Sequence, residues 1–372
     1  MFTILHTESS QGWGGQEMRI LHESLGMLKR GYRPIIVAPE KADIFIRAQE
    51  AGINVFPVYF QKWNPASLLK MRLLIDREKA DIVNTHSSTD SWIATVAARI
   101  SKSGPKIIRT RHLSTPISRS FLSRFIYEIL PDALITTGEE IRQMMIENNK
   151  FKETKIFSIP TGVDLERFNP AKVKPAFEAA GFSIAMIGVL RSWKGHRFFI
   201  EAIPEILERI QDASFYIVGD GPQYENIKNL IRKYLLEDRV FMLGHREDIP
   251  EILASLDVIA HPSYGNEGVP QSILQAMAME RPVVASDAGA IKEVVINGVT
   301  GFLIEPKNPG QIAEKVIELY KNPGLMAKFK KEARLLIEKG YSLEKMLEKI
   351  ELLYRQLLSG KNRSCRVREL LE

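Results

Sequence analysis

The chain has 372 residues, of which 45% are hydrophobic and 26% charged, a composition typical of a globular protein with two domains. The formal net charge of +6 is too modest to indicate nucleic-acid binding, and no nucleic-acid motif is present. No segment approaches the roughly 20 apolar residues of a membrane span, and MFTILHTES lacks the basic region of a signal peptide. With a single cysteine, Cys365, the chain fits a reducing compartment, so we expect a cytoplasmic protein.

Along the first half of the chain, short apolar runs alternate with helical patterns, which predicts an open parallel sheet. A helix is expected over residues 16–30, where Met18, Leu21, Leu25 and Leu28 share one face. Strands are expected at residues 2–7, 34–38, 55–58, 81–85, 106–110, 133–136 and 156–159.

The segment 159–175, IPTGVDLERFNPAKVKP, lacks periodicity and reads as an interdomain connection. A second alternating set follows, and helices over 309–358 end the pattern. Its strands are expected at 182–187, 214–218, 240–243, 258–260, 283–285 and 301–304. The predicted fold class is α/β, with two Rossmann-like doubly wound domains facing across a cleft. We expect domains at 1–163 and 164–341, a helix at 342–360 that packs back on the first domain, and a loose tail at 361–372.

The most informative stretch is 257–286, DVIAHPSYGNEGVPQSILQAMAMERPVVAS, which reads as strand, loop, helix and strand. Gly265, Asn266 and Gly268 form a loop that can bring backbone close to a ligand. Pro270 is expected in the first turn of the helix, whose N-terminus favours a phosphate. Glu267 in the same loop suits sugar hydroxyls, although an ordinary βαβ unit with a solvated glutamate is an equally good interpretation of the spacing.

This stretch resembles the signature of the retaining GT-B glycosyltransferases of family 4, through Glu267, Gly268, Pro270, Ala276, Met277, Ala278, Pro282, Val283 and Val284. The family signature carries two glutamates with seven residues between them, and here the second position holds Gln275. The segments GDGP, LGHREDIPEILASLDV, NGVTGFLIEP and IPTGVDLERF also resemble the family. The resemblance implies transfer of a sugar from a nucleoside diphosphate donor to a hydroxyl acceptor with retained configuration.

The resemblance also implies a donor site in the second domain. In GVLRSWKG (188–195), Arg191 and Lys194 would hold the diphosphate, although two surface cations explain their spacing equally well. The arginine stands two residues later than in many relatives, where Val189 is here. Glu267 would hold the donor sugar and Gln275 the ribose. Further donor-binding residues would lie at the helix N-terminus and beside the base: Gly268, Val269, Pro270 and Gln271, and Gly244, His245 and Arg246.

In the first domain, Gly14 and Gly15 precede a helix, which makes a second anion-capable N-terminus. The family has a paired-glycine loop here against the donor phosphates and sugar. His86 ends a predicted strand, and the family has a histidine facing the donor sugar at this point. A structural role is the commoner one for a lone histidine, and we assign His86 to sugar positioning rather than to general-base work. Arg111 and His112 end the next strand and are expected on the acceptor side.

One feature is independent of the resemblance: no acidic residue occurs between Asp90 and Glu128, an interval rich in cations. They are Arg99, Lys102, Lys106, Arg109, Arg111, Arg119 and Arg124. Phe121, Leu122, Phe125 and Ile126 are interleaved with the last of them. A solvated helix face explains scattered charges but not the absence of every carboxylate. We therefore expect this patch, with Arg119 on the acceptor side, to meet an anionic acceptor or an acidic membrane surface.

The sequence contains no Cys cluster, HExxH or Asp-x-Asp pair, so neither a metal nor a cofactor is expected. The expected catalytic residues are Glu267, His86, Arg191 and Lys194. The expected partners are a UDP-, GDP- or ADP-sugar donor, a glycan or lipid-linked acceptor, and the anionic inner face of a membrane, but not nucleic acid. Two alternatives are a sugar-nucleotide 2-epimerase of similar fold and a sugar-nucleotide-binding protein without turnover.

Overall fold

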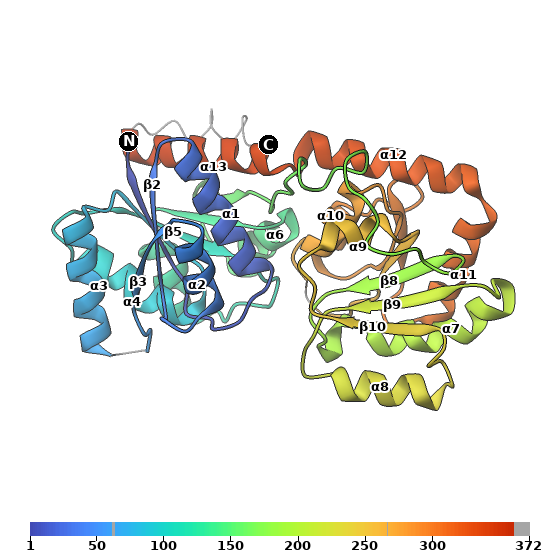
Figure 1. Cartoon of the computed structure of the whole chain (residues 1–372). Coiled ribbons are helices and arrows are strands. Elements are labelled where there is room, and N and C mark those ends of the chain that lie inside the picture. The colour runs from blue at the N-terminus through green and yellow to red at the C-terminus, as the bar shows by residue number, and fades with distance from the viewer. Residues whose placement is uncertain (62–63, 266, 361–372) are drawn as a thin grey trace. The chain divides into compact units, whose positions relative to one another are not determined.

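The structure is a computed structural model that describes residues 1–61, 64–265 and 267–360. Asn266 and the expected loose tail, 361–372, lie outside the described residues. The chain divides into two compact units, drawn in Figure 1. Unit 1 is Met1–Thr161 together with the chain from Glu344 on, and unit 2 is Gly162–Leu343. Each unit contains one parallel sheet with helices, so the predicted α/β class with two Rossmann-like domains is confirmed.

Unit 1 is built on a seven-stranded parallel sheet in the order β3-β2-β1-β4-β5-β6-β7. Its strands are β1 (Thr3–Thr7), β2 (Arg33–Ala38), β3 (Asn54–Pro57), β4 (Ile82–Thr85), β5 (Lys106–Arg111), β6 (Ala133–Thr136) and β7 (Ile156–Ser158). All five residues of β1 are buried, as expected for a parallel strand with both faces covered. Leu5 belongs to one apolar cluster with Val83 and Ile107, and on the other face His6 Nε2 lies 3.7 Å from Glu23 Oε1 of α1 (Gly15–Lys29).

The helices of unit 1 alternate with these strands. After α1 they are α2 (Asp43–Glu50), α3 (Pro65–Glu78), α4 (Ser88–Arg99), the short α5 (Phe121–Arg124) continued by the π-helix η1 (Phe125–Ile129), α6 (Glu139–Glu147) and the 3-10 turn η2 (Glu153–Lys155). The sequence itself sets the start of α4. Ser87 and Asp90 form a capping box that satisfies N–H groups at both positions.

The last helix, α13 (Leu343–Ser359), packs on α1 within unit 1, as Figure 1 also shows. Gly26 makes this close approach possible, because a Cβ there would lie 2.3 Å from Cδ1 of Leu347. Around this contact, Arg30 Nη1 lies 2.7 Å from Glu351 Oε2. In the interior, the Tyr354 hydroxyl donates to Glu23 Oε1 at 2.5 Å. A helix distant in sequence thereby becomes part of the core beside β1.

Unit 2 is built on a six-stranded parallel sheet in the order β10-β9-β8-β11-β12-β13. Its strands are β8 (Ser183–Ile187), β9 (Ser214–Val218), β10 (Val240–Gly244), β11 (Val258–His261), β12 (Val283–Ser286) and β13 (Gly301–Ile304). Its helices are the 3-10 turn η3 (Ser192–Lys194), α7 (His196–Arg209), α8 (Tyr224–Lys233), α9 (Ile249–Ala254), α10 (Gln271–Ala278), the 3-10 turn η4 (Gly289–Glu293), α11 (Pro309–Lys321) and α12 (Pro323–Gly340).

Alternate residues of each unit 2 strand face opposite sides of the sheet, and two apolar clusters result. On β8, Ile184 and Met186 join one cluster, whereas Ala185 and Ile187 join the other. Both faces are thus filled with side chains, as the continuous apolar runs of the sequence predicted. In both units the ends of the observed strands fall within one residue of the predicted ends.

The strand orders locate where each unit can bind a ligand. The order reverses between β1 and β4 in unit 1 and between β8 and β11 in unit 2. In doubly wound sheets, the loops that leave such neighbouring strands diverge and leave a crevice at the carboxyl ends. His86 follows β4, whereas Lys194 and Glu267 lie in the connections that follow β8 and β11. These expected catalytic residues therefore lie at the switch point of their own unit.

Candidate functional site

In unit 2, the site is organised by an ion pair between the loops that follow β8 and β11. Lys194 Nζ lies 2.6 Å from Glu267 Oε1, with the side chains 19% and 13% exposed. Ser263 Oγ lies 2.7 Å from the same carboxylate oxygen and 2.9 Å from the Trp193 carbonyl oxygen, and its single hydroxyl proton can be donated to either. The structure therefore brings together two residues that are 73 positions apart and that the sequence analysis selected separately.

Two glycines allow these loops to approach. Gly195 has φ +82°, and a Cβ there would lie 2.0 Å from the Pro262 carbonyl oxygen. Gly289 has φ +58°, and a Cβ there would lie 2.2 Å from the Glu267 carbonyl oxygen. The amide of Ala290 donates to that same carbonyl oxygen at 3.1 Å. The backbone of Glu267 is thus fixed by tight contacts, so its carboxylate is positioned before any ligand arrives.

The electrostatics keep Glu267 ionised. Burial on its own raises the pKa of Glu267, but Lys194, His261 and Ser263 outweigh it, and the net pKa is lowered. Burial, together with the charge of Lys194, lowers the pKa of His261 to about 3, so this imidazole is neutral near pH 7. His261 Nε2 lies 3.9 Å from Glu267 Oε1. The sequence analysis missed His261, although its place at the end of a predicted strand is the same signal that identified His86.

Arg191 is arranged differently from Lys194. Its side chain is exposed, and its guanidinium carbon lies 5.0 Å from the ring centroid of Trp193, a cation–π arrangement. Within the described residues, no carboxylate pairs with Arg191. The structure therefore brings Lys194 onto Glu267 and leaves Arg191 on the rim, stacked on the aromatic ring of the same loop.

The N-terminus of α10 corrects one prediction. Pro270 is not in the first turn of the helix but at its N-cap, with ψ 132°, and α10 begins at Gln271. The carbonyl oxygen of Pro270 accepts the amides of Ile273 and Leu274 at 3.1 and 3.2 Å. Val269 is buried, whereas Gly268 and Gln271 are partly exposed. The predicted helix N-terminus therefore begins one residue later than the sequence analysis placed it.

Gln275, at the position of the missing second glutamate, lies one turn into α10 and is 8% exposed. Gly244 ends β10 with φ +67°, where the register with β9 shifts. Its carbonyl oxygen accepts the Gly219 amide at 2.8 Å, which ties it to the GDGP turn. The next residue, His245, is exposed. Arg246 is also exposed, and its guanidinium binds both carboxylate oxygens of Asp248, at 2.8 and 2.5 Å.

In unit 1, the loop after β1 contains a buried carboxylate that the sequence analysis did not identify. Glu8 is fully buried, and its Oε1 accepts the amides of Ser9 and Ser10, both at 2.8 Å. Burial, and then the nearby charge of Asp90, raise the pKa of Glu8 to about 8. The loop ends at Gly14, the N-cap of α1, and Gly15 is the first residue of the helix. A protonated acid therefore lies close to the predicted glycine loop.

Three histidine rings form a hydrogen-bonded chain across the ends of β1, β4 and β5. His6 Nδ1 lies 3.0 Å from His86 Nε2, and His86 Nδ1 lies 3.0 Å from His112 Nε2. Burial is the largest cause that lowers the pKa of each ring, and Arg19 lowers all three further. All three rings are therefore neutral, and each nitrogen pair shares one proton. The tautomers of the three rings are therefore linked. Either His6 donates to His86 and His86 to His112, or His112 donates to His86 and His86 to His6.

A buried polar network lies beyond His6. His6 Nε2 is 3.7 Å from Glu23 Oε1, and Asn84 Nδ2 donates to the Tyr354 hydroxyl at 3.1 Å. Arg19, on α1, is fully buried, and its Nη1 donates to Thr161 Oγ1 at 3.1 Å. Each ring nitrogen of His86 thus faces another histidine rather than a carboxylate. His6 and Glu23 had no signal in the sequence except their places on an apolar strand and an amphipathic helix.

Most cations between Asp90 and Glu128 are buried or paired with other residues of unit 1, which corrects the prediction that they form one basic surface. Arg109 is 4% exposed, and its guanidinium lies 3.7 Å from the ring centroid of Tyr127. Arg111 donates to the Tyr127 hydroxyl at 2.7 Å and to Thr115 Oγ1 at 2.8 Å. Two others form ion pairs, Arg99 with Asp132 and Arg124 with Glu128. Lys102 and Arg119 are exposed, and Lys106 is partly exposed.

Metal ligands and membrane-spanning helices are both absent from the part of the chain that the structure describes. Among those residues, no group of three or more His, Cys, Asp or Glu side chains is arranged to hold a metal ion. Over the same residues, no helix combines the length and apolar character needed to cross a membrane.

Comparisons with known proteins identify the family. Residues 13–167 match the model described as Glycosyltransferase Family 4, and residues 170–336 match Glycosyl transferases group 1. A UDP-Gal:alpha-D-GlcNAc-diphosphoundecaprenol alpha-1,3-galactosyltransferase of Escherichia coli is 31% identical over 313 residues, which cover 79% of this chain and 80% of that protein. The chain belongs to glycosyltransferase family 4. It is a retaining glycosyltransferase that uses nucleotide-sugar donors, in a family that needs no metal.

Solved structures agree with this family 4 assignment. A glycosyltransferase of Rickettsia africae has a TM-score of 0.87 and 25% identity, and the alignment covers 97% of this chain and 99% of that one. The Anabaena protein HepE, in complex with UDP and glucose, shares the fold with a TM-score of 0.84 and 19% identity, covering 97% and 100%. The predicted GT-B fold is thereby confirmed, as is the predicted family.

Proposed function

We propose that this glycosyltransferase moves a sugar from a UDP-sugar to a hydroxyl of a sugar that is attached to a lipid through a diphosphate. The supporting observation is the similarity to the Escherichia coli enzyme, whose name gives UDP-Gal as donor and a diphosphoundecaprenol-linked GlcNAc as acceptor. We place the reaction in the cytoplasm, at the inner face of the membrane, where the diphosphate of such an acceptor is accessible.

We assign donor binding to residues 164–341, around the ion pair of Lys194 and Glu267. An ammonium group has three N–H donors, and the contact with Glu267 at 2.6 Å uses one of them. A diphosphate can accept the others, which would bring the sugar next to the carboxylate. Glu267 is ionised and acts as an acceptor for sugar hydroxyls. Arg191, exposed on the rim, would add a second positive charge to the diphosphate.

The remaining donor-binding residues would bind the diphosphate and the nucleoside. The N-terminus of α10, from Gly268 to Gln271, would contribute amides to the diphosphate. Gln275, one turn further, would hydrogen-bond the ribose hydroxyls, and the backbone at Gly244, His245 and Arg246 would lie beside the base. Positive charge and oriented amides would then stabilise the leaving diphosphate in the way that a metal does in other enzymes.

We assign the acceptor to residues 1–163, with the helix at 342–360 supporting their core. Gly14 and Gly15 would face the donor. His86 and His112 are neutral, and both ring nitrogens of His86 are engaged with His6 and His112. His86 would therefore orient His112, and His112 Nδ1, which is not part of the histidine chain, would donate to or accept from a sugar hydroxyl. Arg111 and Arg119 would serve the acceptor diphosphate. In the transfer step the acceptor oxygen bonds to the anomeric carbon as the bond to the diphosphate breaks. The proton of the acceptor hydroxyl passes to the leaving phosphate oxygen on the same face.

The test is a donor and acceptor matrix with the purified protein. UDP-, GDP- and ADP-sugars are each incubated with a GlcNAc diphosphate carrying a short alkyl chain, and nucleotide release and product mass are measured. We expect acceptor-dependent release of UDP and a disaccharide product with a retained anomeric configuration, undiminished by EDTA. Release of GDP or ADP instead, or conversion of the donor without an acceptor, would contradict the proposal.

A further inference from the structure

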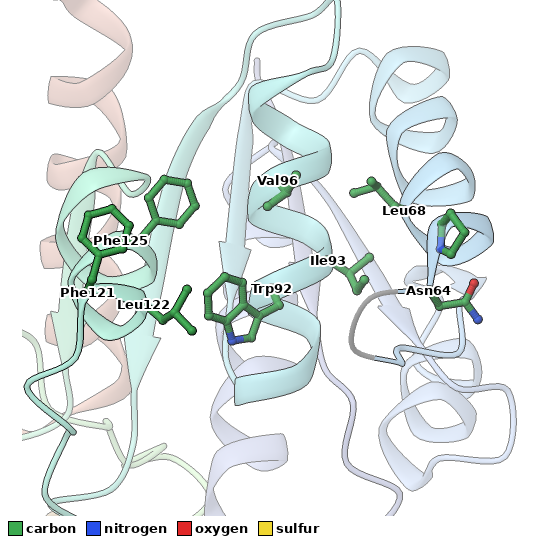
Figure 2. A pocket seen from close by; sticks show the side chains of 9 residues that line it. Asn64, Leu68, Trp92, Ile93, Val96, Phe121, Leu122 and Phe125 are labelled. Atoms are coloured by element: carbon green, nitrogen blue, oxygen red, sulfur yellow. The ribbon is translucent and has the colours of Figure 1, made fainter.

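Unit 1 contains a cavity that none of the residues assigned above to donor or acceptor binding lines. Figure 2 shows it along α4, which carries Trp92, Ile93 and Val96, with Leu68 of α3 on one side and Phe121, Leu122 and Phe125 on the other. Its volume is about 350 Å³, within the range of small-ligand pockets. Phe121 is 73% exposed and Leu122 is 52% exposed, so the cavity opens to solvent through apolar side chains.

The chemistry of the walls selects the kind of ligand. Apart from the indole of Trp92, the described lining residues carry one polar side chain, that of Asn64. Its Oδ1 caps α3 by accepting the amides of Ala66 and Ser67. A polar ligand would therefore lose its hydrogen bonds to water with little replacement. A hydrocarbon chain loses none. Exposed apolar concavities of this kind in globular proteins mark binding sites.

The size of the cavity argues against a protein partner. Among the described residues nine line it, whereas stable protein–protein interfaces use about 20–30 residues on each side. One linear chain fits a cavity of this size, which α4 crosses between α3 and α5. From Trp92 to Val96 the wall of α4 runs for four residues, which is about 6 Å of helix axis. The aromatic rings of Trp92, Phe121 and Phe125 supply broad apolar contact along it.

The position of the cavity relates it to the acceptor site. α4 begins at Ser88, two residues after His86, so Trp92 lies about one helical turn from the carboxyl edge of the sheet. On the other side, the segment 112–120 joins β5, which ends at Arg111, to α5, which begins at Phe121. Along this segment the order is apolar cavity, then the exposed cation Arg119, then the sheet edge with His112. A lipid-linked sugar has the same order of hydrocarbon, diphosphate and sugar.

The charge of the surroundings is complementary as well. Asp90 itself is fully buried in the first turn of α4. Between it and Glu128, the interval that contributes the rest of α4 and all of α5, the sequence has no carboxylate. Glu128 itself is neutralised by Arg124 Nε at 2.6 Å. A diphosphate carried to this region by its hydrocarbon therefore meets Arg119 and no opposing negative charge from this segment.

We propose that the cavity between α3, α4 and α5 binds the first part of the hydrocarbon chain of the acceptor lipid, and that this contact contributes to acceptor selection. The proposal rests on the proposed function for the identity of the acceptor. Each methylene removed from water favours binding by about fourfold, so a chain long enough to fill the cavity lowers the KM of the acceptor by about tenfold or more after ordering costs.

The kinetic experiment compares two acceptors with the same sugar diphosphate and alkyl chains of two and twelve carbons, in detergent-free buffer below micelle formation. The readout is the ratio of the two KM values. We expect a ratio of about ten or more for the unsubstituted protein. Leu122→Ser, which removes apolar wall, and Val96→Trp, which fills the cavity, should bring the ratio to within about twofold of one.

Two control variants distinguish binding in the cavity from non-specific contact with exposed apolar side chains. Leu73→Ser changes an α3 side chain that is 57% exposed and does not line the cavity, and Leu235→Ser changes one in unit 2 that is 86% exposed. Both should keep the full ratio. A ratio near one in the unsubstituted protein overturns the proposal, as does a ratio that Leu73→Ser lowers as much as Leu122→Ser, which would indicate non-specific contact of the alkyl chain with exposed apolar side chains instead.

A binding measurement keeps this test independent of turnover. Farnesyl diphosphate and inorganic diphosphate are titrated into the protein by calorimetry. We expect farnesyl diphosphate to bind at least tenfold more tightly, and Val96→Trp to remove the difference. If no acceptor is glycosylated but this difference is found, the proposed function fails and the cavity stands. Transfer to the short-chain acceptor with equal binding of both diphosphates would overturn the cavity proposal and leave the proposed function intact.

Discussion

The two switch points share a strand order and differ in how they handle charge. In unit 2, Lys194 and Glu267 are held as an ion pair, and the pKa of Glu267 is lowered despite its burial. In unit 1, Glu8 and the histidine chain are held neutral beside the buried Arg19: burial raises the pKa of Glu8 to about 8 and lowers those of His86 and His112 well below their usual range. One sheet edge thus carries fixed charges, and the other carries neutral groups that can both donate and accept.

The difference matches the two substrates of a glycosyltransferase. A nucleotide diphosphate is an anion that needs fixed positive charge, whereas an acceptor hydroxyl is neutral and needs groups that orient its proton. Placing unpaired charges beside the hydroxyl would add nothing and would have to be solvated by the protein. With the donor assigned to unit 2 and the acceptor to unit 1, as proposed above, the same architecture would support two kinds of recognition, because the loops after its strands differ.

The largest effect is expected when the ion pair of Lys194 and Glu267, the charged edge of the unit 2 sheet, is removed. Lys194→Met leaves the buried Glu267 carboxylate without its main partner, so we expect kcat/KM to fall by about 100-fold or more. The free energy of unfolding should fall by about 2 kcal/mol, less than for a fully buried pair, since both side chains are partly exposed. Steady-state kinetics and chemical denaturation measure the two effects.

The matched control is Arg197→Met, which removes a surface pair with Glu201 in the same unit at 2.7 Å. Its arginine is 72% exposed, and we expect the free energy of unfolding to fall by less than about 0.5 kcal/mol. The double variant Lys194→Met with Glu267→Gln should recover stability but not activity. If Lys194→Met alone is as active as the unsubstituted protein, the charged edge is not the donor site.

The next prediction tests whether Glu8, at the neutral edge of the unit 1 sheet, is protonated in the folded chain. Glu8 binds its proton more tightly in the folded chain than in the unfolded chain, where its pKa is near 4.5. The stability that this proton contributes is complete below pH 4.5 and is lost as the pH rises through about 8. Glu8→Gln keeps a neutral side chain at every pH. We therefore expect its unfolding free energy, relative to the unsubstituted protein, to rise by up to about 4 kcal/mol between pH 5 and pH 8.5, at about 1.4 kcal/mol per pKa unit.

Glu40→Gln serves as the control because Glu40 is exposed, and its relative stability should stay flat over the same range. Denaturant midpoints at four or five pH values measure both variants. A flat profile for Glu8→Gln would mean that Glu8 is already ionised in the folded state. The contrast between the two sheet edges would then be lost.

The fold was predictable because apolar runs and turn residues place every strand locally. The histidine chain was not, because His6 and His86 are 80 positions apart and meet through the adjacency of β1 and β4. The strand order of a doubly wound sheet could have suggested it, since residues just beyond neighbouring strands share an edge. The family resemblance identified His86 and left His6 unnoticed as part of an apolar strand.

Charge was the least predictable property. Arg109 looked like part of a basic surface, but tertiary packing buries it against Tyr127. Glu8 was not selected from the sequence, and its carboxylate accepts two backbone amides inside unit 1. Whether a polar side chain faces solvent depends on contacts from elements distant in the sequence, and periodicity carries no information about them.

The smallest effect concerns the one departure from the family signature, Gln275. This side chain is 8% exposed on α10, so Gln275→Glu places a carboxylate in a buried position of the charged edge. Without donor, the desolvation of that carboxylate should lower the unfolding free energy by up to about 1 kcal/mol. With donor, charge-assisted hydrogen bonds to the ribose are stronger by about 1 kcal/mol, so we expect the donor KM to fall by about fivefold or less and kcat to change by less than about threefold. Gln275→Leu, which removes both hydrogen-bonding atoms, should raise the donor KM instead. A Gln275→Glu enzyme without turnover would show that this edge tolerates no further negative charge beside Glu267, and that its balance of charge, rather than its hydrogen bonds alone, sets donor binding.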